Sequence, residues 1–148
     1  MLLNRLRQEP CPYSQTAHFI LYVKDQTIST EFYTRVLGCV PRLDVPGMTE
    51  FALSGGAVLG LMPVSGIKRL LGDKLPNPEA VRGVPCAELY LVVDNATVFH
   101  QRTLAAGGRE LSPVTTRDWG HVAGYCLDPD GHVVAFANAL EKKVGKNT

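Results

Sequence analysis

Two stretches of the chain alternate apolar and polar side chains in the same way. The first covers residues 17–25 (AHFILYVKD) and the second residues 87–94 (AELYLVVD), and each reaches an acidic residue just before a helix-like segment. Alternation with a period of two predicts a strand, whereas apolar residues three or four positions apart predict a helix. The order of strand and helix thus occurs twice, which predicts two related units that meet around a shared cleft, where small ligands bind.

The first predicted unit continues from its strand into a helix and three short strands. Asp25 can cap the helix, apolar residues recur through it at helical spacing, and Gly38 ends it. Turn signals at residues 45–47 (VPG) and 54–56 (SGG) separate the strands expected at 39–43, 49–53 and 57–62. Residues 17–63 are therefore predicted to form a βαβββ unit.

The second predicted unit, residues 86–138, has the same order of elements. A strand at 88–93 leads to a helix that Asn95 can cap and that the pair Gly107-Gly108 ends. Strands are expected at 110–114, which Pro113 interrupts, and at 121–127 and 132–137, with the turn DPDG at 128–131 before the last strand.

The remaining segments are a linker and a tail. Residues 64–85 are rich in proline, glycine and charge, and are expected to link the two units, with a short helix around residues 67–71. Residues 139–148 are expected to be a solvated tail.

Composition restricts the class of protein further. A chain of 148 residues is long enough for one compact domain, and its formal net charge of +1 provides no basic surface for nucleic acid or an anionic membrane. No apolar run reaches the roughly 20 residues of a membrane span, and no signal peptide is recognised, so we expect a cytoplasmic protein. The four cysteines (Cys11, Cys39, Cys86 and Cys126) are scattered, which favours buried thiols over a zinc site.

The paired units, the helix ending FYTRVLG at residues 32–38 and the sequence DPDGH at residues 128–132 resemble the vicinal oxygen chelate superfamily. This superfamily includes glyoxalase I, extradiol dioxygenases, fosfomycin resistance enzymes and bleomycin-binding proteins. The resemblance implies an α+β fold, in which two βαβββ modules curl their mixed sheets around a shared cavity. It also implies a homodimer, because chains of this superfamily commonly dimerise.

The resemblance implies positions for a divalent metal on the first and last strands of each module. His18 and Glu88 stand at the two first-strand positions, but Gly60 and Ala135 occupy the last-strand positions and offer no donor atom. Because such a site needs about three protein ligands, we expect neither a metal nor another cofactor. A divalent metal held by His18 and Glu88, with the shell completed by water or a linker residue, is the alternative.

Family symmetry would bring His18 and Glu88 toward one another. A carboxylate beside an imidazole fixes its tautomer, so the pair could abstract a proton in an enzyme. The two side chains could equally satisfy each other as a buried hydrogen-bonded pair without any catalytic role.

Period-two alternation places one set of side chains toward the cavity and Phe19, Leu21 and Val23 toward the helix. The ligand-binding residues predicted in this way, together with the only tryptophan and a nearby tyrosine, are His18, Ile20, Tyr22, Met62, Glu88, Tyr90, Trp119 and Tyr125. Lys68, Arg69 and Lys74 in the linker favour a neutral or anionic ligand.

The sequence thus predicts a protein that binds a small organic ligand between its modules without a catalytic metal. One alternative is an enzyme of the lyase, isomerase or dioxygenase type, metal-dependent or metal-free, that uses His18 and Glu88. The other alternative is a structural or interaction module whose cavity is filled by side chains.

Overall fold

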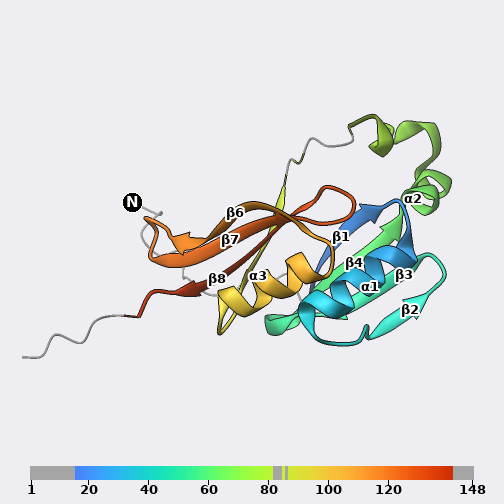
Figure 1. Ribbon diagram of the computed structural model, residues 1–148. Coiled ribbons are helices and arrows are strands. Elements are labelled where there is room, and N and C mark those ends of the chain that lie inside the picture. Colours follow the sequence, from blue (N-terminus) through green and yellow to red (C-terminus); the bar gives the residue numbers. More distant parts are fainter. Residues whose placement is uncertain (1–15, 82–84, 86, 142–148) are drawn as a thin grey trace, which may run out of the picture.

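The computed structural model describes residues 16–81, 85 and 87–141, and contains two four-stranded mixed sheets with one helix packed on each (Figure 1). The first sheet has the strand order β1-β4-β3-β2, with β1 and β4 parallel and the other neighbours antiparallel. Its elements are β1 (Ala17–Val23), α1 (Gln26–Leu37), β2 (Leu43–Val45), β3 (Met48–Ala52), a short 3₁₀ turn η2 (Ser54–Gly56) and β4 (Ala57–Pro63).

The second sheet repeats this topology with the order β5-β8-β7-β6, and β5 is parallel to β8. Its elements are β5 (Glu88–Val92), α3 (Ala96–Ala105), β6 (Arg109–Thr116), β7 (His121–Leu127) and β8 (Val133–Ala139). The predicted α+β fold of two βαβββ modules is therefore confirmed, although neither sheet closes on itself.

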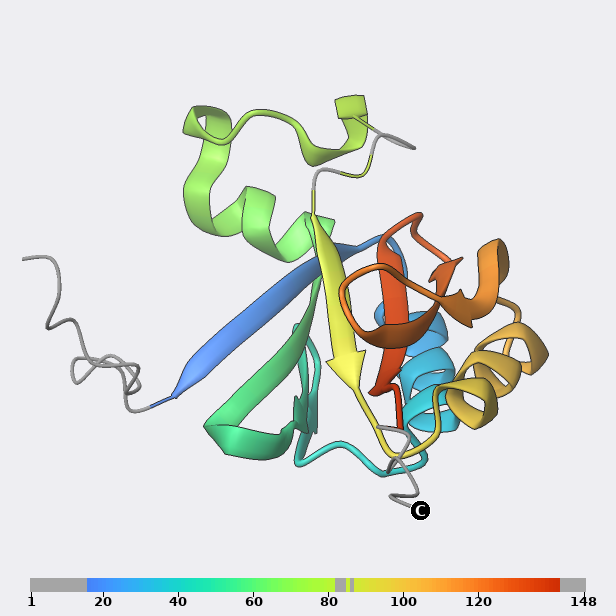
Figure 2. The same ribbon diagram turned by 90° about the vertical axis from the view of Figure 1, so that its left-hand side faces the viewer.

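The segment between the modules is largely helical. It contains α2 (Val64–Leu71), η3 (Gly72–Lys74) and η4 (Pro78–Val81), and it lies beyond the ends of β4 and β5 (Figure 2). The helix predicted around residues 67–71 is thus present, but it begins directly after β4. Within the part of the chain that the structure describes, no helix has the length and apolar character required to cross a membrane.

The helix boundaries follow from the predicted caps. The Asp25 side chain accepts a hydrogen bond from the backbone N–H of Ile28 at 3.0 Å, and Asn95 does the same for Val98 at 3.3 Å. Gly38 ends α1 with φ = 69°, a left-handed conformation that favours glycine.

Two strands differ from their predicted ranges. β2 occupies residues 43–45 instead of 39–43. The two-residue turn Pro46-Gly47 pairs Val45 directly with Met48, so the strand continues to the residue before the turn. β6 extends from 109 to 116 instead of ending at 114. The edge strand accommodates Pro113 through register shifts between Glu110 and Thr115.

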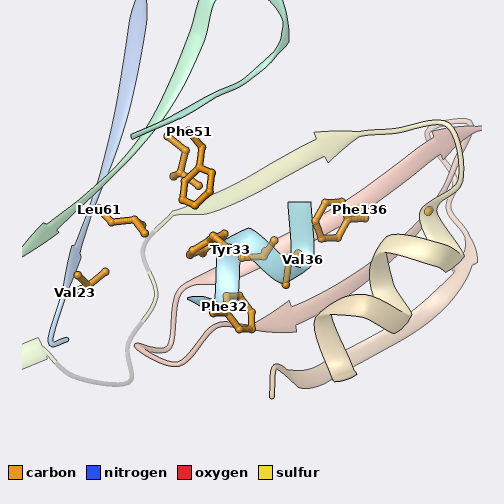
Figure 3. Packing of buried hydrophobic residues seen from close by; sticks show 10 residues of the cluster. Val23, Phe32, Tyr33, Val36, Phe51, Leu61 and Phe136 are labelled. Atoms are coloured by element: carbon orange, nitrogen blue, oxygen red, sulfur yellow. The ribbon is translucent and has the colours of Figure 1, made fainter. Parts of the chain in front are cut away.

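One hydrophobic core joins the two modules. Val23, Phe51 and Leu61 of the first sheet, Tyr33 and Val36 of α1, and Val134 and Phe136 of β8 belong to the same buried cluster (Figure 3). The partly buried residues Leu21, Leu89, Leu91 and Val93 pack against it, as their alternation predicts. The helices α1 and α3 contact each other, so the modules meet through their helical sides (Figure 1).

Hydrogen bonds connect the turn before β8 to the first module. The buried hydroxyl of Tyr33 donates to Asp128 Oδ2 at 2.8 Å, and the backbone N–H of Lys24 donates to Asp130 Oδ1 at 2.7 Å. Asp128 Oδ1 accepts from the backbone N–H groups of Asp130 and His132. Burial raises the pKa of Asp128, against the opposing effects of His132 and of the Tyr33 hydrogen bond. The DPDG turn is thus a contact between modules as well as a turn.

Candidate functional site

A groove of about 780 Å³ lies between the two modules. It is bounded by β1, the start of β5, the linker and the turn before β8, which Figure 2 shows converging on one another. Its volume falls within the range of about 300–1,000 Å³ typical of small-molecule sites. The apolar residues that line it are Phe19, Ile20, Leu21, Tyr22, Val64, Pro78, Pro85, Ala87, Leu89, Pro129 and Val133.

Phe19 departs from its predicted position. Its side chain was expected to pack toward the helix with Leu21 and Val23, but it is 55% exposed and lines the groove. Only the second half of β1 reaches the shared core, where Val23 is fully buried. The first half of the strand therefore leaves both of its faces open, and Ile20 on the other face is 43% exposed.

The charged residues at the groove are mainly acidic. Glu79, Glu88 and Asp130 line it, while Lys24 is the one lysine or arginine among its described residues. Glu79 lies 3.8 Å from the ammonium of Lys68, so this linker cation is partly neutralised. Glu88, at the exposed start of β5, forms no ion pair with a described residue.

His132 also lines the groove. Its Nε2 lies 3.0 Å from the backbone carbonyl oxygen of Tyr22. Because a carbonyl only accepts hydrogen bonds, Nε2 must carry the proton, and Nδ1 of the neutral ring is then an acceptor. The sequence does not indicate this hydrogen bond, because Tyr22 belongs to the other module.

A second cluster lies on the face of the second sheet, around Tyr90. Its hydroxyl lies 2.7 Å from His121 Nδ1 and accepts a hydrogen bond from Trp119 Nε1 at 3.0 Å, while the imidazole stacks on the Tyr90 ring with centroids 5.9 Å apart. The indole N–H only donates, so the hydroxyl hydrogen of Tyr90 is available for Nδ1 of neutral His121. Trp119 is 53% exposed and presents a flat aromatic surface.

Tyr125 completes this aromatic face. Ala135 of β8 pairs with Tyr90 on one side and Tyr125 on the other, and the two rings contact each other with their centroids 6.5 Å apart. The Arg117 guanidinium lies 5.2 Å from the Tyr125 ring centroid. Desolvation and the neighbouring charges of Glu88 and Tyr90 raise the pKa of Tyr125, and Arg117 opposes this shift. Tyr125 is therefore a neutral hydrogen-bonding group at neutral pH.

A third cluster lies on the face of the first sheet and contains His18. Its Nδ1 lies 3.7 Å from Glu50 Oε1, and Arg42 binds the other oxygen of the same carboxylate at 2.7 and 2.8 Å. Glu50 pairs across the sheet with Gly60, which occupies the predicted last-strand metal position. His18 thus has a different carboxylate partner from the Glu88 that family symmetry suggested. The one sequence signal for Glu50 was its place in the strand predicted at residues 49–53, where alternation assigns it to one face of the sheet.

These donors do not fit the divalent metal site that the resemblance implies. Gly60 and Ala135 provide no ligand, and Arg42 already engages the Glu50 carboxylate beside His18. Over residues 16–81, 85 and 87–141, no group of three or more His, Cys, Asp or Glu side chains is placed to hold a metal ion.

The predicted ligand-binding residues are therefore distributed over several surfaces. Ile20, Tyr22 and Glu88 line the groove. Tyr90, Trp119 and Tyr125 share the face of the second sheet, and His18 lies on the first. Met62 pairs with Tyr22 and lies close to Gly66 of α2.

Comparisons with known proteins agree with this fold. A sequence model of the Glyoxalase/Bleomycin resistance protein/Dioxygenase superfamily matches residues 15–136, and the chain therefore belongs to that superfamily. The chain is 26% identical to a glyoxalase-related enzyme from Fulvimarina pelagi, with a TM-score of 0.71 over 84% of this chain and 87% of that one. No curated protein matches it.

Other solved structures share the fold at lower identity. A glyoxalase/bleomycin resistance protein/dioxygenase family enzyme from Burkholderia phytofirmans is 16% identical, with a TM-score of 0.72 over 84% of this chain and 98% of that one. A related protein from Nocardioides is 20% identical, with a TM-score of 0.67 over 89% of this chain and 87% of that one. The family prediction is confirmed, and at these identities the structures establish the fold alone.

Proposed function

We propose that the protein binds a small organic ligand in the groove between its modules. The observation that carries this proposal is the open groove of about 780 Å³, with its apolar walls and few polar groups. An open groove favours ligand binding over the alternative of a cavity filled by side chains.

The exposed walls provide a physical reason for binding. Phe19 and Ile20 are 55% and 43% exposed on neighbouring positions of β1, where they form part of the groove. Removing such apolar surface from water is favourable by roughly 25 cal/mol per Å². A ligand with an apolar body would cover apolar groove surface that now faces water.

Ile20 offers a test with a matched control. Ile20 lines the groove, whereas Ile28 on α1 is a similarly exposed isoleucine outside the groove. Ile20→Ala removes three carbons, worth about 2.4 kcal/mol when fully buried at ~0.8 kcal/mol each. Since the residue is 43% exposed before binding, a ligand that covers it gains about 1 kcal/mol from these carbons.

The variant should therefore bind such a ligand about fivefold more weakly, and Ile28→Ala should bind it normally. Compounds would be found by thermal shift in a library of small amines, alcohols and acids, and their dissociation constants measured by calorimetry. A library without any stabilising compound, or an equal loss of affinity in both variants, would contradict the proposed function.

The emission of Trp119 distinguishes the groove from the face of the second sheet. Trp119 is the only tryptophan of the chain, and neither Trp119 nor its hydrogen-bond partner Tyr90 lines the groove. A groove ligand should raise the melting temperature and leave this emission unchanged. A ligand that stacks on the Tyr90 cluster should quench it, which would place the binding site there instead.

We also propose that the protein forms a homodimer. Val92, Leu111 and Trp119 of the second module are 62%, 51% and 53% exposed. Large apolar side chains that face water are covered at protein interfaces, where tryptophan is enriched. Sedimentation equilibrium should show twice the chain mass of 16.1 kDa, and a mass equal to that of one chain at micromolar concentration would contradict the proposal.

A further inference from the structure

We infer that the groove selects small amphipathic cations, that is, molecules with an apolar or aromatic body and a protonated amine. This inference rests on the proposed function, because it specifies the chemical class of the groove ligand. It reverses the preference for neutral or anionic ligands that the linker lysines and arginine suggested.

The hydrogen-bonding groups of the groove are mostly acceptors. The carboxylates of Glu79, Glu88 and Asp130 accept hydrogen bonds, and so does Nδ1 of His132 when its ring is neutral, because Nε2 then donates to the Tyr22 carbonyl. The Lys24 ammonium is the one charged donor among the described lining residues. A ligand head group that donates hydrogen bonds and carries positive charge is therefore complementary to this lining.

Glu88 is the strongest candidate for the anchor of the amine. Lys68 lies near Glu79, and Asp130 accepts a backbone hydrogen bond from Lys24. Glu88 has no such contact with a described residue, and its negative charge raises the pKa of the neighbouring Tyr125 phenol. Its carboxylate is thus available to an incoming cation at the edge of β5.

The apolar walls suit the rest of such a molecule. Phe19 presents an exposed aromatic ring within the groove, and Tyr22 provides a second one. A cation near an aromatic face is attracted by the ring quadrupole, while an anion is repelled. The walls and the head-group site therefore favour the same class of ligand.

Three probes with one body and different head groups test the inference: phenylpropylamine, phenylpropanol and phenylpropionate. Binding at pH 7 and low salt would be followed by amide chemical shifts of Ile20, Glu88 and Val133. Even with Glu79 paired to Lys68, carboxylates outnumber the one ammonium among the described lining residues, so the amine should bind at least about tenfold more tightly than the acid, with the alcohol between them. Added salt should reduce this ratio.

Two variants test whether the charge of Glu88 is responsible for the preference for the amine. Glu88→Gln should weaken amine binding by about threefold to fivefold and leave alcohol binding unchanged, because it removes one exposed charge at constant shape. Glu31→Gln is the matched control, because Glu31 is an exposed glutamate on α1 that does not line the groove, and it should leave amine binding unchanged.

The outcomes separate this inference from the proposed function. If the acid or the alcohol shifts the groove amides at equal or lower concentration than the amine, the cation preference is overturned and the groove remains a ligand site. Equal amine binding by wild type and Glu88→Gln would overturn the role of Glu88. If none of the three probes shifts any groove amide, the proposed function falls as well.

Discussion

The hydrogen bond between Tyr33 and Asp128 is expected to stabilise the contact between the modules. Tyr33 lies on α1 and is fully buried, and Asp128 begins the turn before β8 and is 5% exposed. Tyr33→Phe removes the donor to Asp128 Oδ2 and leaves the ring packing intact. The two backbone donors to Oδ1 remain, so the variant loses one hydrogen bond to a buried charged group.

Hydrogen bonds to charged groups contribute about 1.5–3 kcal/mol, so we expect the variant to lose about 2 kcal/mol of unfolding free energy. For a chain of this length that corresponds to a fall in melting temperature of roughly 4–8 °C. Urea unfolding followed by circular dichroism measures the free energy. Tyr22→Phe is the control, because the Tyr22 hydroxyl forms no hydrogen bond with a described residue.

The loss of unfolding free energy in Tyr33→Phe should depend on pH in a defined direction. Burial raises the pKa of Asp128 above its unfolded value, so this group favours the folded state at low pH and that contribution is lost as pH rises through the folded pKa. The Tyr33 bond opposes the shift by stabilising the ionised carboxylate. Tyr33→Phe should raise the pKa of Asp128 further, and its destabilisation should be full at neutral pH and shrink as pH falls through that pKa.

Two results would refute this reasoning. If Tyr33→Phe costs no more than Tyr22→Phe at neutral pH, the bond contributes no net stability. If its cost is the same at neutral and acidic pH, the partner of Tyr33 is not an ionised Asp128.

Two further predictions concern the packing between α3 and its sheet. A Cβ added to Gly124 would lie 2.5 Å from His100 Nδ1 and 2.7 Å from Val114, so Gly124→Ala should lower the unfolding free energy by about 1–3 kcal/mol, as measured in urea. The control Gly66→Ala in α2 has room for the added carbon and should raise the unfolding free energy by up to about 1 kcal/mol. Equal effects of the two substitutions would contradict the packing around Gly124. Burial raises the pKa of the Cys126 thiol to about 11, so iodoacetamide at pH 8 should leave Cys126 unmodified and alkylate the exposed Cys39. Peptide mass mapping would identify the modified cysteine. Prompt labelling of Cys126 in the folded protein would refute its burial.

The cysteines show how far composition alone can be used. Burial was expected for all four thiols because they are scattered and small, and Cys126 confirms it. Cys39 is exposed. It lies between Gly38 and β2, outside the sheet, because the Pro46-Gly47 turn pairs residues 43–45 with β3 instead of the predicted 39–43. Cys11 and Cys86 lie outside the described residues.

The candidate site was only partly predictable. Ile20, Tyr22 and Glu88, which alternation placed toward the cavity, do line the groove, but Phe19 and Leu21 from the other face of β1 line it as well, so alternation alone did not distinguish the lining residues. The partners of His18 and His132 were not predictable. Glu50 and Tyr22 reach them through sheet pairing and module packing, over separations of 32 and 110 residues.

The sequence by itself determined the local features of this protein. Caps at Asp25 and Asn95, the glycine that ends α1 and period-two alternation define two βαβββ modules, because each depends on neighbouring residues alone. Only the tertiary structure decided how the modules meet. They pack through α1 and α3 around one core and leave an acidic groove at Glu88, while strand pairing within the first sheet places His18 beside Glu50. Such contacts depend on the packing of distant surfaces, which no local pattern encodes.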